Sequence, residues 1–348
     1  MESSITKQPY IPRHPLISKR GKVWRVVLII ILTLFLGGSG FLYGTNKGHD
    51  LRRMIVGTII SSQHPQYMKY LSFLLPQSEI NELYQAMLHP PTRNSLLTPV
   101  GKKKNSITTR SSESIHVDTI NTPNFTAKVM VVPDPTTVHL VGTRYSDKGQ
   151  PLSDLIKEKN GVAGINGGGF FDPKGDGSGA QPVGIEISNG KVICTPNSYN
   201  VPQLVGAFLQ DGQFITGRYS VNQLKKLNVR EAVSFGPQLI VNGQDEVTSN
   251  VDSAWGWAPR TAIGQEKNGS IVMIITDGRF YWNKTHRGAT MSDMVHLFER
   301  YNVTNAIAMD GGGSTTMIKD GTLQLQPATN TSVGMRYLPD AWVVIPHS

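Results

Sequence analysis

The sequence predicts a mixed α/β (α+β) fold, in which one sheet-dominated domain with few helices follows a single N-terminal transmembrane helix. Three observations lead to this prediction. Residues 26–44 form an apolar run without a charged residue. From about residue 116, short apolar segments of β type alternate with turn residues. In the same region, only a few segments show the 3.6-residue periodicity of an amphipathic helix.

The apolar run Val26–Gly44 is predicted to be a membrane anchor. As a helix it spans about 28 Å, close to the roughly 30 Å of a bilayer's hydrocarbon core. Basic residues dominate the preceding segment 1–25, in which Glu2 is the only acid. Because basic flanks stay in the cytoplasm, we expect a single-pass protein of the cell membrane with a cytoplasmic tail and an extracytoplasmic domain. The alternative is a cleaved signal peptide, but residues 40–44 offer no convincing small-x-small cleavage site.

The positive charge is concentrated in the N-terminal third of the chain. The whole chain has a net charge of +9, with 34 Lys and Arg against 25 Asp and Glu. Residues 1–110 carry +11 and residues 111–348 carry −2. A basic flank beside a membrane fits anionic lipid or a wall polymer better than a nucleic-acid duplex. The sequence therefore argues against nucleic-acid binding.

Cys194 is the only cysteine. No internal disulfide can form, so the exported domain must be stabilised by its own core. The residues after about 115 are enough for one sizeable domain. Cys194 ends the strand-like segment 191–194, and we expect a buried, inert thiol there.

Two segments separate the anchor from the predicted domain at 116–348. Residues 45–90 show helical spacing of apolar residues, interrupted by Pro65 and Pro76, and are predicted to be a helical stalk. A dimer contact or a lid would fit the same pattern. Residues 91–115 are polar, basic and rich in Gly, Ser and Pro, which is typical of a flexible linker.

The domain itself is predicted to consist mainly of short strands. The predicted strands are 127–132, 137–141, 162–165, 183–187, 191–194, 207–210, 238–241, 270–276, 306–309 and 341–345. The predicted helices are 152–159, 221–226 and 292–301. Ser292 is the expected N-cap of the last helix.

Four clusters share one format, in which a hydrophobic strand runs into a turn that carries a charged or amide side chain. They are residues 164–172, 259–264, 274–279 and 308–317. Glycine permits close approach of the backbone, and successive glycines can turn their N–H groups toward one anion. Arginine offers a planar fork that suits phosphate. Together the clusters predict a site for an anionic, phosphorylated ligand with carboxylates beside it.

Single features have simpler explanations. The Asp-Gly pair at 277–278 alone is most often a β-turn, and Arg260 alone a surface cation. Residues 172–176 resemble part of a calcium loop, but its twelfth position would be Val183. No cofactor is therefore required, although a structural Ca²⁺ is not excluded. Ser314 lacks the Gly-x-Ser-x-Gly surroundings of a nucleophile elbow, and the histidines show no zinc spacing.

Taken together, the clusters resemble the phosphodiester glycosidase family over about residues 112–348. The resemblance rests on Asn-Gly-Gly-Gly-Phe-Phe at 166–171, Pro-Arg-Thr-Ala-Ile-Gly at 259–264, Asp-Gly-Arg at 277–279 and Asp-Gly-Gly-Gly-Ser-Thr-Thr-Met at 310–317. Arg336 resembles the family's closing segment, where Tyr-Leu-Pro follows here instead of the frequent Pro-Val. The family includes the uncovering-enzyme domain, which removes N-acetylglucosamine from a sugar phosphodiester. The anchor and the lack of a cysteine pair are similar to its bacterial, exopolysaccharide-linked branch.

The resemblance implies hydrolysis of the bond between a sugar's anomeric carbon and a phosphodiester oxygen. Asp310 is the leading catalytic carboxylate, and Asp277 and Glu186 are candidates for a second one. Asn166 is expected to orient a sugar hydroxyl, and Arg260 and the 311–314 backbone to bind phosphate. The full set of implied substrate-binding residues is Asn166, Gly167, Gly168, Arg260, Thr261, Arg279, Gly311, Gly312, Gly313, Ser314 and Arg336.

Two other functions use the same residues. One is a non-catalytic module that binds anionic glycans during polysaccharide assembly. The other is a transferase that passes the sugar to a polymer hydroxyl. In a protein that only binds phosphorylated glycans, the negative charge of Asp310 would repel the phosphate. The presence of Asp310 at this site therefore favours catalysis. The expected partner is a phosphorylated glycan or wall polymer near the membrane, in wall or exopolysaccharide metabolism.

Overall fold

The computed structural model describes residues 19–62, 65–97, 114–172, 177–196, 198–329 and 331–347. It divides into two compact units, Met1–Arg52 and Arg53–Ser348. The first unit holds the helix α1 (Lys19–Gly44) and the start of α2 (Asn46–Ser61). Within the described residues, Val23–Gly44 is the one helix long and apolar enough to cross a membrane. Its Thr33 hydroxyl donates to Ile29 O at 2.8 Å, so this polar group is satisfied inside the helix.

The largest sheet of the second unit has seven strands, all paired antiparallel. In spatial order they are β1 (His116–Asn121), β2 (Thr126–Val132), β15 (Ile271–Thr276), β14 (Thr261–Glu266), β16 (Val303–Met309), β12 (Gln238–Val241) and β13 (Gln244–Asp245). Every residue of β15 is buried. Successive side chains of a strand point to opposite faces, so Met273 packs into one core and Ile274 into another.

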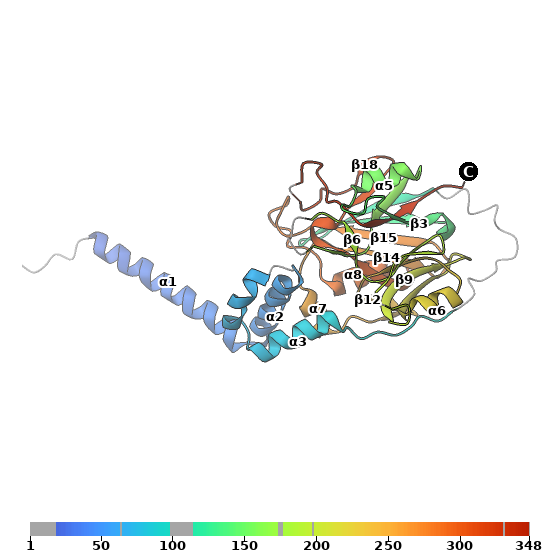
Figure 1. Ribbon diagram of the computed structural model, residues 1–348. Coiled ribbons are helices and arrows are strands. Elements are labelled where there is room, and N and C mark those ends of the chain that lie inside the picture. The colour runs from blue at the N-terminus through green and yellow to red at the C-terminus, as the bar shows by residue number, and fades with distance from the viewer. Residues whose placement is uncertain are drawn as a thin grey trace, which may run out of the picture. The chain divides into compact units, whose positions relative to one another are not determined.

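Two five-stranded antiparallel sheets complete the domain (Figure 1). The first has the order β10 (Phe214–Tyr219), β9 (Gln203–Leu209), β11 (Val229–Ser234), β7 (Glu186–Ser188) and β8 (Lys191–Cys194). The second has the order β18 (Thr322–Leu323), β17 (Met317–Lys319), β4 (Ala163–Asn166), β19 (Asp340–Val344) and β3 (Val138–Gly142). A short pair, β5 (Phe170–Phe171) and β6 (Gln181–Pro182), lies apart from them.

All three large sheets contribute to one central core. Phe208 of β9 is a fully buried member of this core, with ring-centroid distances of 4.8 Å to Phe214 and 5.4 Å to Trp342. Helices cover the outer faces of the sheets: α8 (Met291–Glu299) for the seven-stranded sheet, and α6 (Val221–Lys226) and α5 (Leu152–Glu158) for the others. Two 3₁₀ turns complete this region, η2 (Pro135–Thr137) and η3 (Gly312–Ser314).

The predicted stalk is helical, but from Arg53 onward it belongs to the same compact unit as the sheets. It contains η1 (Pro65–Phe73) and α3 (Gln77–Leu88), and α3 packs beside α7 (Ser249–Trp255) (Figure 1). Apolar side chains of this segment form a small core with Ala254 of α7. The segment is therefore a wall of the domain rather than a spacer. Residues 98–113 of the predicted linker lie outside the described residues.

The predicted fold class is confirmed, because the structure is a mixed α/β, sheet-rich single domain with one apolar N-terminal helix. Two local predictions were wrong. The segment from Pro259 to Gly264, expected as a turn, forms the central strand β14 from Thr261 onward. A Cβ at Gly264 would lie 2.8 Å from Val303 Cγ1, so its missing side chain lets β16 approach. The N-cap of α8 is Thr290, not Ser292.

Candidate active site

A cleft of about 700 Å³ opens where several strand ends and their loops meet. Residues of all four predicted clusters line it: Gly169 and Phe170, Arg260, Arg279, and the turn from Asp310 to Gly313. Arg336 of the closing segment lines it as well. Antiparallel pairing of β14 with β15 and β16 brings the ends of distant sequence segments to this one place.

Asp310 follows the last residue of β16 and has a fixed backbone. Its N–H donates to Gly167 O at 3.0 Å, and its carbonyl accepts from Asn166 Nδ2 at 2.6 Å. Its carboxylate accepts from Gly311 N at 2.9 Å. Burial raises the pKa of Asp310, while the Ser314 hydroxyl, the charge of Arg336, Gly311 N–H and the charge of Arg279 act in the opposite direction.

Two guanidinium groups share the cleft with Asp310. Arg279 has a left-handed backbone with φ of 60°. Burial lowers the pKa of its guanidinium, whereas the negative charge of Asp310 raises it. Arg336 forms an ion pair with Asp172 at 3.1 Å. A Cβ at Gly312 would lie 2.8 Å from Arg279 Nη2, so glycine at this position lets the guanidinium approach the turn. The arrangement can bind an anion beside a carboxylate.

The 311–314 backbone, expected to bind phosphate, is largely occupied by the protein itself. Gly311 N–H donates to Asp310, Gly312 N–H to Pro259 O, and Ser314 N–H to Gly311 O. These hydrogen bonds shape the 3₁₀ turn that follows Asp310. The guanidinium groups are therefore the more available anion-binding groups of this cleft.

Arg260 lines the cleft, but its guanidinium is tied to the backbone. It donates to Trp255 O at 2.6 Å, Gly256 O at 2.7 Å and Ala289 O at 3.3 Å. Burial, followed by the charge of Arg279, lowers the pKa of Arg260 to about 9. Arg260 therefore fixes the loop after α7 in addition to bordering the cleft.

Asn166, expected to orient a sugar hydroxyl, instead holds the protein together. Its side chain is fully buried. Its amide N–H donates to Asp310 O, and its oxygen accepts from Thr261 Oγ1 at 2.8 Å and Thr316 N at 3.1 Å. Asn166 and Thr261 therefore position the Asp310 turn from behind, and neither borders the cleft.

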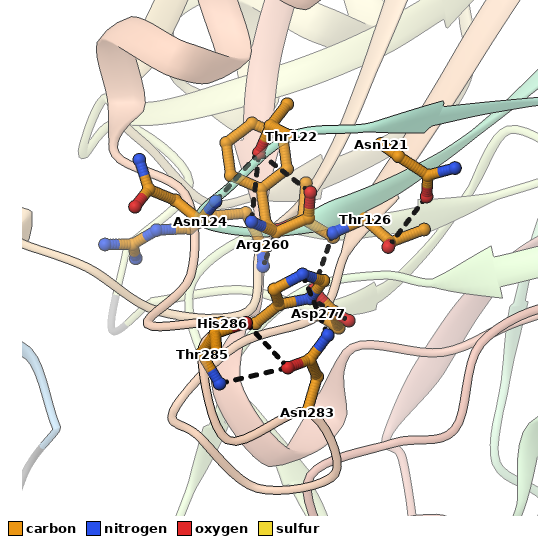
Figure 2. Close-up of polar contacts among 11 residues, drawn as sticks. Asn121, Thr122, Asn124, Thr126, Arg260, Asp277, Asn283, Thr285 and His286 are labelled. Carbon is orange, nitrogen blue, oxygen red and sulfur yellow. Dashed lines mark hydrogen bonds and ion pairs between the residues drawn. The ribbon is translucent and has the colours of Figure 1, made fainter.

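Asp277 lies at the base of the turn that carries Arg279 and does not border the cleft. Its carboxylate accepts from Thr126 N at 2.8 Å and lies 2.8 Å from His286 Nδ1. Figure 2 shows Asp277 between Thr126 and His286, with Asn283 below. Asp277 thus closes the turn, and this geometry does not support a second catalytic carboxylate at this position.

The remaining predicted residues lie behind the cleft. Glu186 on β7 is 1% exposed and is absent from the residues that line the cleft. Gly167 and Gly168 pack against Asp340. Ser314 is fully buried in η3. These residues pack behind the wall of the cleft and do not line its surface.

Several cleft residues were not identified from the sequence. Asp172, considered only for calcium, borders the cleft and holds Arg336. The segment from Met87 to Pro90 forms part of the wall, although it is more than 70 residues from the nearest glycine-rich cluster. Asp340, which lies behind the cleft, was also missed, although an acid at the start of an otherwise apolar strand is a detectable signal.

No group of three or more His, Cys, Asp or Glu side chains in the described part of the chain is arranged to hold a metal ion. Residues 173–176 of the expected calcium loop lie outside that part. Cys194 is half-buried, and burial, followed by the charge of Glu186, raises the pKa of its thiol.

Fold and cleft define the class of protein: a sheet-rich domain with one carboxylate turn held among arginines. Residues 159–345 match the family model described as phosphodiester glycosidase. The chain belongs to the phosphodiester glycosidase family.

Named relatives support this membership. The mouse N-acetylglucosamine-1-phosphodiester alpha-N-acetylglucosaminidase is 28% identical over 193 residues, which cover 49% of this chain and 34% of the mouse protein. The SPbeta prophage-derived uncharacterized protein YomE of Bacillus subtilis (strain 168) is 27% identical over 201 residues, 54% of this chain and 28% of that protein. The chain thus spans about a third of the length of these relatives.

Solved structures share the fold. The zebrafish N-acetylglucosamine-1-phosphodiester alpha-N-acetylglucosaminidase catalytic domain, auto-inhibited by its pro-peptide, has a TM-score of 0.55 at 20% identity. The similarity covers 67% of this chain and 83% of that structure. A hypothetical protein from Synechocystis has a TM-score of 0.51 at 14% identity, over 66% of this chain and 61% of that one.

Proposed function

We propose that this chain is a hydrolase that cleaves the glycosidic bond of sugar-1-phosphodiesters. One observation carries the proposal: the Asp310 turn shares its cleft with the guanidinium groups of Arg279 and Arg336. Family membership and the activity in the name of the mouse relative support it.

The residues suit the charges of this reaction. Glycosidic cleavage passes through an oxocarbenium-like state, which the ionised carboxylate of Asp310 would stabilise. The leaving group is a phosphate monoester, on which negative charge develops as the bond breaks. Arg279 and Arg336 would stabilise this charge in a partly buried site, where such interactions are stronger than in water.

We further propose that the substrate lies near a membrane. Val26–Gly44 is apolar and long enough to span a bilayer, and the segment before it is strongly basic. An uncleaved anchor of this orientation would keep the cleft on the extracytoplasmic side, within reach of wall polymers or exopolysaccharides. A cleaved signal peptide would give the same compartment without the tether.

The alternatives are a glycan-binding module and a sugar transferase. The carboxylate of Asp310 argues against a pure binder, because placing a negative charge beside a bound phosphate costs binding energy. A transferase would use the same cleft and differ in the acceptor, so released free sugar separates hydrolysis from transfer.

The test uses the detergent-solubilised full chain and a panel of α- and β-linked sugar-1-phosphodiesters, including N-acetylglucosamine. We expect free sugar from at least one compound. Asp310→Asn should lower the rate at least a thousandfold while leaving the unfolding curve unchanged. The matched control is Asp154→Asn, an exposed acid on α5, which should retain full activity.

Two results would contradict the proposal. A folded wild-type protein that binds the compounds but releases no sugar would favour the binding module. An active Asp310→Asn variant would remove Asp310 from the reaction.

A further inference from the structure

Two buried carboxyl groups lie directly behind the cleft, outside the residues that line it. Asp340 on β19 is 0% exposed, and Glu186 on β7 is 1% exposed. Each has one oxygen, Glu186 Oε1 and Asp340 Oδ2, without a hydrogen-bond partner among the described residues. Two buried, unpaired ionised carboxylates would cost several kcal/mol each, so this arrangement needs an explanation.

Glycines on both sides of Asp340 make the space for these carboxyl groups. Gly142 of β3 is the cross-strand partner of Asp340, and a Cβ there would lie 2.7 Å from Glu186 Oε1. Cross-strand partners direct their side chains to the same face, so Glu186 occupies the space beside Asp340. On the other side, a Cβ at Gly167 would lie 2.0 Å from Asp340 Oδ1.

A short chain of hydrogen bonds joins this pair to Asp310. Asp340 Oδ1 accepts from Gly168 N at 2.7 Å, and Asp340 O accepts from Gly167 N at 3.2 Å. Gly167 O accepts from Asp310 N at 3.0 Å. The turn at 167–168 is therefore held by Asp340 on one side and holds Asp310 on the other.

No cation compensates the pair in the contacts of the described residues. Burial, and then the charge of Asp340, raises the pKa of Glu186 to about 9. Burial also raises the pKa of Asp340 to about 7. The hydrogen bond from Gly168 N–H lowers this pKa, and the charge of Asp310 raises it. Besides these acids, Cys194 of β8 is the cross-strand partner of Glu186, so its thiol lies on the same face of the sheet.

A second buried acid of the same region shows the contrast. Glu231 on β11 is fully buried, but its Oε1 lies 2.9 Å from His139 Nδ1 and 3.3 Å from Arg230 Nη1. Its Oε2 accepts from Asn189 N at 3.0 Å. The Glu231 carboxylate is therefore compensated, whereas Glu186 and Asp340 are not.

We propose that Glu186 and Asp340 form a buried acid pair that holds at least one proton at neutral pH and, through the Gly167–Gly168 turn, sets the position of Asp310 and the charge behind it. Glu186 keeps its proton to higher pH than Asp340, because only Asp340 accepts a hydrogen bond from Gly168 N–H. Glu186 and Asp340 are positioning residues, and their effect on turnover rests on the proposed function. The shared proton itself does not.

Folding stability tests the shared proton without any activity. Both acids have raised pKa values in the folded state, so they stabilise it fully below their unfolded values of about 4. That contribution is lost as pH rises through about 7 for Asp340 and about 9 for Glu186. Urea unfolding of the full chain between pH 5 and 9.5 should show this decline, and Glu186→Gln should flatten it. Glu231→Gln should leave the slope as in wild type.

The pH profile of kcat/KM tests the link to Asp310. Asp340 ionises near pH 7 and adds negative charge behind Asp310, so kcat/KM of wild type should fall above about pH 7, and Asp340→Asn should lose this fall. Glu186→Gln keeps a neutral group at its position and should retain the fall. A role in folding alone would lower kcat/KM equally at every pH.

Three results would overturn the inference. One is an identical pH dependence of stability in wild type and Glu186→Gln. The others are a fall of kcat/KM above about pH 7 that persists in Asp340→Asn, and its loss in Glu231→Gln. Absence of hydrolysis would contradict the proposed function, while the stability measurement would still decide the inference.

Discussion

At the scale of single residues, Asp310 is subject to opposing influences. Burial favours its neutral form, whereas Ser314, Arg336 and Arg279 favour the carboxylate. The proposed reaction needs the carboxylate. The ascending limb of its pH profile should therefore lie above the ordinary aspartate pKa of about 3.9, at a position that its neighbours determine.

Replacing Arg336 by Gln tests this balance. The variant loses a cation that stabilises both the Asp310 carboxylate and the departing phosphate. We expect the limb to move to higher pH and kcat/KM to fall roughly ten- to a hundredfold, as loss of a charge-assisted hydrogen bond costs about 1.5–3 kcal/mol. The measurement is kcat/KM from pH 4 to 9, with Arg300→Gln at the exposed end of α8 as control. A limb that stays in place would contradict this assignment of Arg336.

At the scale of elements, hydrogen bonds at helix and strand ends decide where the chain turns. Thr290 and Asp293 form a capping box at the start of α8, because the Thr290 hydroxyl accepts from Asp293 N and the Asp293 carboxylate accepts from Thr290 N. Ser292, the N-cap expected from the sequence, lies inside the helix. Its N–H donates to Asp252 Oδ1 instead.

These two positions offer a paired test. Thr290→Ala should lower the free energy of unfolding by about 1 kcal/mol, since a side-chain cap is lost. Ser292→Ala should change it by a few tenths of a kcal/mol at most, because only its backbone bonds to Asp252. Urea denaturation measures both. If Ser292→Ala lowered the free energy of unfolding more than Thr290→Ala, the assignment of the N-cap to Thr290 would be wrong.

The elements also show how far the sequence predicts the structure. Strands with short apolar runs rich in β-branched residues, such as β15 and β12, were predicted almost to the residue, because such runs are typical of a strand buried on both faces. The glycine-rich turns that the sequence grouped together contribute residues to one cleft. Strand β14 was missed, since its small residues show no alternation and only its neighbours in the sheet define it.

The candidate site was predictable in its groups and less so in their roles. The family resemblance assigned Asp310, Arg279 and Arg336 to one site, and all three line the cleft. It could not show that the Asn166 amide is fully used within the protein. It also missed Asp340, whose position depends on long-range pairing of β19 with β3 and β4.

At the scale of the whole molecule, the helical segment after Arg53 completes the cleft. Close contacts dock it: Thr58 Oγ1 accepts from Trp257 N at 2.9 Å, and Ser61 Oγ donates to Trp255 O at 2.9 Å. A Cβ at Gly57 would lie 1.7 Å from Ser253 O. Because Met87 to Pro90 line the cleft, the docking of this segment bears directly on the site.

Gly57→Val should loosen this docking. The added side chain has no space, and such overpacking costs typically about 1–3 kcal/mol. We expect faster trypsin cleavage within residues 53–93 and a lower kcat/KM. Limited proteolysis measures the effect. The control variant is Ser78→Ala, at an exposed position on α3. Equal cleavage rates in Gly57→Val and wild type would show that the segment is not docked as described.

The central claim is that the chain breaks the bond between the sugar carbon and the phosphodiester oxygen, with Asp310 at the reacting carbon. The most direct test is turnover of a sugar-1-phosphodiester in ¹⁸O-labelled water, followed by mass spectrometry of the phosphate product. Cleavage at carbon leaves the phosphate monoester unlabelled, and Asp310→Asn should abolish its formation. A labelled phosphate would mean that water attacks phosphorus, and it would contradict the account.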